Sequence, residues 1–198
     1  MSKSSFPTAA LSIVRVADFD AWLPKFDATA QLRKDNGILG HHHDRGADDP
    51  NLVCTFFIVG DRQRATSFLL APELVTRLAS QGITVVQNEM VAVVEDRTAR
   101  GGQYASVLLT HEVENFERWM AGFDGHAEAR RRASIVGHGV CRSIDRPLRV
   151  HVYLQAESPD KLRALLAGDD TRDAMRKAGV TGTPEVKLMT DTGIWAQY

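Results

Sequence analysis

The chain has 198 residues, 43% of them hydrophobic and 25% charged, so it can bury a substantial core as one large domain or two small ones. Twenty-four basic side chains against 25 acidic ones leave a net charge of −1, which argues against nucleic acid and membrane surfaces as partners. No apolar run approaches the length of a transmembrane helix, and segment 1–7 lacks the apolar stretch of a signal peptide. The two cysteines, Cys54 and Cys141, are too few and too far apart for a disulfide framework. We therefore expect a cytoplasmic protein with reduced thiols.

The first half of the chain predicts the order strand, helix, strand, strand, helix, strand. The run at 52–59 is apolar on both faces of a strand, which is typical of a strand that is covered on both sides. A polar, glycine-bearing linker is expected at 96–104, between a first domain at 1–95 and a second at 105–198. The elements expected in this half are strands near 9–16, 38–45, 52–59 and 86–94, and helices near 18–35 and 62–81.

The second half predicts the same order. Asn115 stands where an N-cap would, ahead of Trp119 and Phe123, whose helical spacing gives one buried face. Ser158 marks the start of a later helix, with proline in its first turn. The expected elements are strands at 105–113, 135–143, 148–155 and 186–190, a helix from 116 to 132, a helix from 159 and a short helix near 171–178.

An internal duplication explains the repeated order. A shift of 97 residues aligns the halves without a gap, and between positions 19 and 59 there are 13 identities in 41 pairs. The expected fold class is therefore α+β, with two ferredoxin-like βαββαβ repeats, each an antiparallel sheet with helices on one face. The identities include the pairs Phe19/Phe116, Trp22/Trp119, Phe26/Phe123, Arg33/Arg130, Gly40/Gly137, His41/His138 and Arg45/Arg142.

A sheet covered by helices on one side leaves its other face bare. We expect the bare faces of the two repeats to pack sheet to sheet and to close a pseudo-dimeric α+β barrel within one chain. The alternative is a pair of independent domains that each dimerise elsewhere. In the barrel the chain would be a monomer with an internal pseudo-dimer, open to further oligomerisation.

Several stretches together form a recognisable pattern. They are His111-x-Val-x-x-Phe-x-x-Trp119, Phe123-Asp124, Gly137-His138, Arg142 and the Asp-Asp-Pro-Asn run at 48–51. In these residues, and over nearly all of both halves, the sequence resembles the dimeric α+β barrel superfamily, which includes antibiotic-biosynthesis-monooxygenase-like domains and small bacterial proteins labelled "cyclase". Because this superfamily hosts monooxygenases, isomerases, haem-handling enzymes and proteins of no known reaction, the resemblance specifies the fold more than the activity.

The resemblance implies two functions from different classes. The first is a cofactor-independent monooxygenase, cyclase or isomerase that acts on a small aromatic or polyketide-like molecule. The alternative is a non-catalytic barrel that binds a small ligand or mediates assembly. Neither function requires a cofactor or a metal ion, and a small molecule is the expected partner in the first.

Histidine is the titratable residue that is concentrated at suggestive places. His111, His138 and His151 fall on the first three strands of the second repeat, where their rings could share one face of a ligand pocket and supply a catalytic base or a metal site. Tyr153, Arg142 and the duplicated His41 are the residues expected to orient a substrate. The alternative is a set of separate histidines with local hydrogen bonds in a partly polar barrel.

The two repeats are not equivalent at these positions. The first repeat has Val14 where the second has His111, and Cys54 where the second has His151. Since valine cannot hydrogen-bond a ligand, we expect a functional cavity to be built chiefly from residues 105–190, with the three histidine rings converging on it.

Other repeated or clustered residues favour structural roles. The run His41-His42-His43 looks like a metal tract, but alternate strand residues face opposite ways, so at most His41 and His43 point together. The duplicated tryptophans have the helical spacing of core residues. The duplicated arginines could bind an anionic substrate or pair with duplicated acids; the pairs concerned are Arg33/Arg130, Arg45/Arg142 and Asp27/Asp124.

Overall fold

The computed structural model describes residues 7–198, so the expectation for the extreme N-terminus lies almost wholly outside the described residues. In this range the element order is βαββαβ twice, as expected. The helices expected at 18–35, 62–81 and 116–132 are each divided into two, and the two helices expected after Ser158 are both present. The first repeat contains β1 (Thr8–Arg15), α1 (Phe19–Asp27), α2 (Ala30–Asp35), β2 (Ile38–Gly46), β3 (Leu52–Val59), α3 (Arg62–Leu69), α4 (Pro72–Ser80) and β4 (Thr84–Arg97). The second contains β5 (Ala105–Val113), α5 (Phe116–Gly125), α6 (Ala127–Arg132), β6 (Ile135–Ser143), β7 (Arg149–Ala156), α7 (Pro159–Ala167), α8 (Asp169–Lys177) and β8 (Val180–Gln197).

Local chemistry accounts for the helix boundaries. The Asn115 side chain accepts a hydrogen bond from the backbone N–H of Arg118 at 2.8 Å, which confirms it as the N-cap of α5. Asp18 caps α1 in the same way. The expected helix over 62–81 is interrupted because Ala71 precedes Pro72, and proline pushes the preceding residue into the extended conformation that Ala71 adopts.

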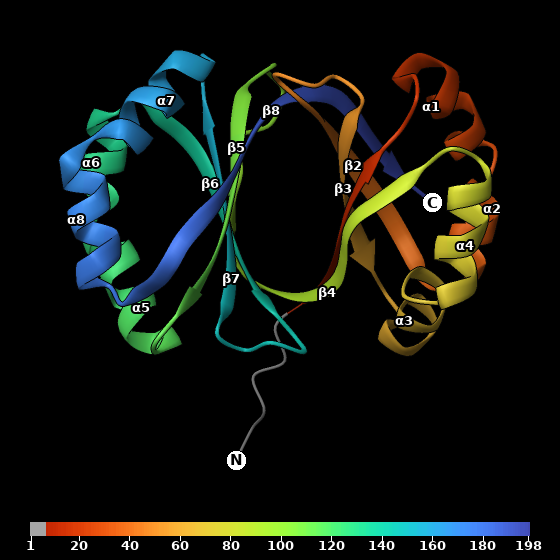
Figure 1. Ribbon diagram of the computed structural model, residues 1–198, viewed down its shortest axis with the longest axis horizontal. Helices are drawn as coiled ribbons and strands as arrows, with labels where there is room; N and C mark the ends of the chain where they lie inside the picture. Colours follow the sequence, from red (N-terminus) through yellow and green to blue (C-terminus); the bar gives the residue numbers. More distant parts are fainter. Residues whose placement is uncertain (1–6) are drawn as a thin grey trace. The chain divides into compact units, whose positions relative to one another are not determined.

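Two compact units make up the described chain. Residues 7–92 and 191–198 form the first unit, and residues 93–190 form the second. Within each unit the helices cover one side of the sheet (Figure 1). The hydrogen-bonded strand order is β4-β1-β3-β2 in the first unit and β8-β5-β7-β6 in the second, which is the ferredoxin-like order.

The last strand of each repeat is longer than expected. β4 and β8 continue past the predicted ends near 94 and 190, and the final segment 191–198 therefore belongs to the first unit rather than to the second domain. The hydrogen-bonded order of all eight strands is closed, β1-β3-β2-β8-β5-β7-β6-β4, which is the strand connectivity expected of an α+β barrel.

Each unit has its own core between helices and sheet. Trp119 and Trp22 are 3% and 9% exposed, which confirms the expectation that both are core residues. Each tryptophan packs among buried residues of its own repeat, with Phe116 beside Trp119 and Phe19 beside Trp22. In residues 7–198 no helix is both long enough and apolar enough to cross a membrane.

Candidate functional site

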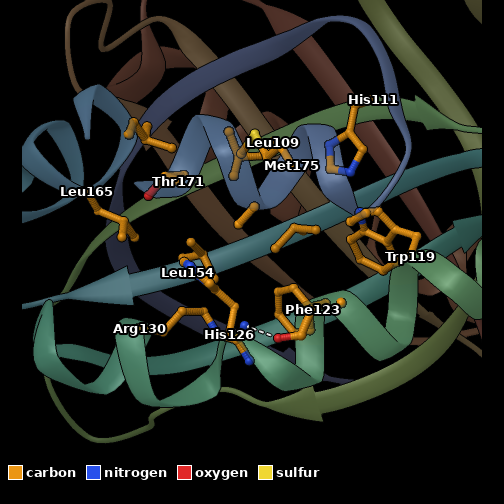
Figure 2. A pocket seen from close by; sticks show the side chains of 15 residues that line it. Leu109, His111, Trp119, Phe123, His126, Arg130, Leu154, Leu165, Thr171 and Met175 are labelled. Carbon is orange, nitrogen blue, oxygen red and sulfur yellow. Dashed lines mark hydrogen bonds between the residues drawn. The ribbon is translucent and has the colours of Figure 1, made fainter. Parts of the chain in front are cut away.

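A pocket lies in the second unit, between the sheet and helices α5, α7 and α8 (Figure 2). Its empty space, with the open mouth and the adjoining solvent included, is about 570 Å³. Most of the wall is apolar, and four polar side chains interrupt it. The lining residues are Leu109, His111, Trp119, Gly122, Phe123, His126, Arg130, Val152, Leu154, Leu165, Leu166, Thr171, Ala174, Met175 and Ala178.

His111 is the most unusual of these polar residues. Its side chain comes from β5 at an irregularity in the pairing with β8, between Thr110 and Glu112, where a bulge re-aims side chains. The residue is 5% exposed, its ring lies 5.5 Å from the ring of Trp119, and neither ring nitrogen has a hydrogen-bond partner among residues 7–198. Burial, and in second place the nearby His151, lower the pKa of His111 from 6.5 to about 4. At neutral pH the ring is therefore uncharged and retains a free acceptor nitrogen.

Arg130 and Phe123 form the opposite wall of the pocket. The guanidinium carbon of Arg130 lies 3.6 Å from the centroid of the Phe123 ring, and its NH1 donates to the Phe123 carbonyl oxygen at 2.5 Å. Arg130 is 7% exposed, and burial lowers the pKa of its guanidinium, which still carries its charge at neutral pH. A buried cation and a neutral imidazole thus border one apolar cavity.

The first unit repeats this arrangement with one addition. The guanidinium carbon of Arg33 also lies 3.6 Å from a phenylalanine ring centroid, that of Phe26, and its NH1 donates to the Phe26 carbonyl oxygen at 2.7 Å. Here the C-terminal Tyr198 occupies the site: Arg33 Nε donates to its hydroxyl oxygen, which also lies 2.6 Å from Nδ1 of His41. The first unit therefore holds a phenol of its own chain beside the arginine.

His41 and His43 point together, as the strand alternation predicts, with ring centroids 4.5 Å apart. Both are buried against Phe26, and the Nε2 atom of each has no hydrogen-bond partner in the described part of the chain. Burial, reinforced by Arg33 and by neighbouring histidines, lowers the pKa of His41 to about 4 and that of His43 to about 2. His41 thus belongs to the core of the first unit and does not border the pocket of the second.

The expectation that three histidine rings converge on one cavity is wrong. His111 pairs with Val150 on β7, and residues directly opposite in a sheet share a face, so the next residue, His151, lies on the other face. There Nδ1 of His151 hydrogen-bonds the hydroxyl of Thr110 at 2.9 Å. Tyr153 is two residues further along β7 and shares that second face, away from the pocket.

His138 and Arg142 are also outside the lining of the pocket. His138 lies on the helix-covered face, 5.5 Å from the Phe123 ring, and its Nε2 is 3.3 Å from a carboxylate oxygen of Glu95. His138 pairs with Leu154 on β7, whereas His111 pairs with Val150. These two partners are four residues apart, which is roughly 13 Å along the strand. Arg142 donates from Nε to the Pro147 carbonyl and covers the Phe116 ring at 4.3 Å, a role that Arg45 repeats with Pro50 and Phe19.

Sequence reasoning missed two polar residues of the pocket. His126 lies at the break between α5 and α6, and Thr171 lies on α8; neither has an identical counterpart in the first repeat. Arg130 was noted for its duplication, and the structure shows that both copies bind a backbone carbonyl rather than a duplicated acid. The available signal was the duplicated Phe-x₆-Arg spacing, which places a guanidinium over an aromatic ring in both repeats.

Comparison with known proteins identifies the fold. No family model and no curated protein matches the sequence. Among solved structures, an anthrone oxidase-like protein is similar over 100% of this chain and 95% of its own, with a TM-score of 0.65 and 13% identity. A ferredoxin-fold protein from Listeria monocytogenes related to antibiotic biosynthesis monooxygenases matches with a TM-score of 0.59, 6% identity and coverage of 96% and 98%. Chlorite dismutase from Candidatus Nitrospira defluvii matches with a TM-score of 0.61, 13% identity and coverage of 94% and 92%.

These identities are too low to carry an activity across, and they establish the architecture alone. The neighbours match over nearly the whole of this chain, so both repeats are part of the likeness. The chain shares the ferredoxin-like α+β fold of these structures, with two βαββαβ repeats in one polypeptide.

Proposed function

We propose that the second unit binds a small planar aromatic molecule with a hydroxyl or enol group, and oxygenates it without a cofactor. The observation that carries this proposal is His111, whose two nitrogens have no hydrogen-bond partner among residues 7–198 although the ring is buried in an apolar pocket. An unpaired buried polar group is costly, so such a group at a pocket wall favours a ligand that supplies the missing hydrogen bond.

The first unit supports a phenolic ligand class. At the offset of 97, Tyr198 aligns with Gly101, so the second unit has no side chain where the first unit has its phenol. The backbone just before these two positions approaches equivalent glycines in the two units. A Cβ added to Gly40 would lie 2.3 Å from the Ala196 carbonyl oxygen, and a Cβ added to Gly137 would lie 2.5 Å from the Ala99 nitrogen. Arg130 therefore borders an open pocket, whereas Arg33 contacts an internal phenol. We infer that a ligand hydroxyl binds beside Arg130 as Tyr198 does beside Arg33.

The two polar groups suit proton removal from such a ligand. A neutral His111 suits acceptance of a proton from the ligand, and the Arg130 guanidinium, at the opposite wall of the pocket, suits stabilisation of negative charge on the ligand's hydroxyl oxygen. The electron-rich anion then reacts with O₂. For a methylene flanked by aromatic rings, as in an anthrone, two C–H bonds are replaced by one C=O bond, and the second oxygen atom leaves as water. The similarity to an anthrone oxidase-like protein supports this choice of substrate class.

Oxygen uptake with anthrone as the probe tests the reaction. His111→Leu removes the proton acceptor without adding a polar group, and we expect the catalysed rate to fall by about 10²- to 10⁴-fold. The duplication supplies a matched pair of tryptophan variants for a binding assay. Because Trp119 lines the pocket and Trp22 does not, quenching of tryptophan fluorescence by the ligand is expected to be lost in Trp119→Phe and kept in Trp22→Phe. Equal oxygen uptake by wild type and His111→Leu would refute the catalytic role of His111.

Non-catalytic binding is the second candidate, and one observation favours it. A pKa of about 4 makes His111 a weak base, better suited to accept a hydrogen bond than to hold a proton. Saturable quenching through Trp119 without oxygen uptake above the uncatalysed rate would establish this function in place of the first.

A further inference from the structure

We propose that His42, Asp44 and Asp191 of the first unit bind one divalent transition-metal ion such as Zn²⁺. Nε2 of His42 lies 3.4 Å from Oδ1 of Asp44 and 3.1 Å from Oδ1 of Asp191, and one ligand atom from each residue lies within 4.8 Å of the others. An ion bound at about 2.1 Å from nitrogen and oxygen ligands separates neighbouring ligand atoms by roughly 3.0–3.4 Å. The two distances from His42 to the aspartates thus match the spacing of neighbouring ligands around one ion.

Burial and charge favour a cation in this cluster. The three residues are 8%, 2% and 6% exposed, so both carboxylates are largely removed from water. Two carboxylates and one imidazole are ligand types that a divalent transition-metal ion accepts together, and the two negative charges compensate the charge of the bound ion.

Neighbouring groups fix the orientation of the ligands. The backbone N–H of Gly193 donates to Oδ1 of Asp191 at 2.7 Å, and the Trp195 ring stacks on His42 at 4.1 Å with an angle of 16° between the planes. The hydroxyl of Thr192 donates to the His43 carbonyl at 2.6 Å, which sets the register of β8 beside β2. Such supporting contacts are typical of metal sites, where they hold the ligands in place before the ion binds. Trp195 is 44% exposed, so one side of the cluster is close to solvent.

The second repeat serves as an internal comparison. At the offset of 97, the three positions are Gly139, Cys141 and Val94, which leaves one thiol in place of an imidazole and two carboxylates. Burial raises the pKa of the Cys141 thiol to about 12, so that position lacks the thiolate that binds metal. The equivalent backbone therefore occurs twice in the chain, and the ligand set occurs in the first unit.

The donor types select the ion. One imidazole nitrogen suits zinc, iron and nickel, whereas Mg²⁺ prefers oxygen ligands throughout. Three protein ligands leave at least one coordination position for water or a small molecule. We therefore expect Zn²⁺ to bind more tightly than Mg²⁺ and to keep an exchangeable position.

Calorimetric titration of the chelator-treated full chain with Zn²⁺ tests the proposal. We expect one equivalent to bind, and Asp191→Asn and Asp44→Asn each to weaken that binding at least about tenfold. Asn at position 191 keeps an acceptor for the Gly193 N–H and removes one of two like charges, so the variant is expected to fold, which circular dichroism checks. Asp20→Asn is the matched control, because this carboxylate has 87% of its side chain exposed and lies outside the cluster.

Co²⁺ provides a second readout that does not depend on stability. Visible d–d absorption is expected on addition of one equivalent to wild type and to His126→Asn, and it should be absent in Asp191→Asn. Two results would overturn the proposal: no Zn²⁺ binding at one equivalent, or equal affinity in wild type and Asp191→Asn. In the first case the three side chains contact one another without a metal ion, and in the second the ion binds elsewhere.

Discussion

Acidification should destabilise the folded protein through three buried histidines. His41, His43 and His111 are 1%, 0% and 5% exposed, and burial is the first cause of their lowered pKa values, which are about 4, 2 and 4. Each folded pKa lies below the unfolded value of 6.5, so the unfolded state binds more protons once the pH falls below about 6.5. The stability from these neutral rings is complete above that pH; it is lost as the pH falls toward 4 for His41 and His111, and toward 2 for His43.

The size of the effect follows from the pKa difference. pH 5 lies about 1.5 units below the unfolded pKa of 6.5, so the unfolded histidine is protonated while the folded ring stays neutral. Each of these units lowers the unfolding free energy by about 1.4 kcal/mol per ring, so each ring loses about 2 kcal/mol. The three together give a loss of roughly 6 kcal/mol between pH 8 and pH 5, a large part of the stability of an ordinary domain.

Urea denaturation at pH 8 and pH 5, in wild type and in His111→Leu, isolates one ring. Every other titrating group is common to both proteins, so the pH-dependent loss should be smaller in the variant by about 2 kcal/mol. The leucine also removes two unsatisfied buried nitrogens, and the variant should therefore be at least as stable as wild type at pH 8. An identical loss in both proteins would show that His111 is protonated in the folded state at pH 5, and would refute the assignment of a neutral ring.

The remaining predictions concern the two cores and the C-terminus. Trp119→Ala should lower the unfolding free energy by roughly 3–5 kcal/mol, as should its counterpart Trp22→Ala, and an unchanged urea midpoint would mean that the ring is not part of the core. Tyr198→Phe removes the hydroxyl shared by Arg33 and His41, which leaves two buried groups without this partner and should cost about 1–3 kcal/mol. If its urea denaturation curve overlays that of wild type, the C-terminal phenol is not bound in the first unit.

Much of the fold could be predicted because its signals are local or repeated. Asn115 precedes a helical spacing of aromatic residues, and its capping hydrogen bond spans three residues. The duplication then doubled each weak local signal, since the same element was expected twice. The ends of β4 and β8 could not be predicted, because strand length depends on the partner strand that continues the ladder and not on the strand's own sequence.

The candidate site was predictable only in part. The concentration of histidines drew attention to His111, which borders the pocket, but also to His151, which lies on the other face. One residue of register decides which face a strand side chain occupies, and composition carries no information about that register. Arg130 was noted as a repeat, but its place over Phe123 depends on the break between α5 and α6.

The sequence by itself determined the tandem repeat, the order of strands and helices within each copy, and the aromatic core beneath each first helix. The tertiary structure decided which side chains meet. His42 and Asp191 are 149 residues apart, and His41 and Tyr198 are 157 apart, so both contacts depend on how β8 is registered against β2. Helix periodicity and capping involve residues within one or two turns, which a sequence displays directly. Contacts across a sheet join segments whose separation along the chain is set by everything between them, and only the folded chain brings those side chains together.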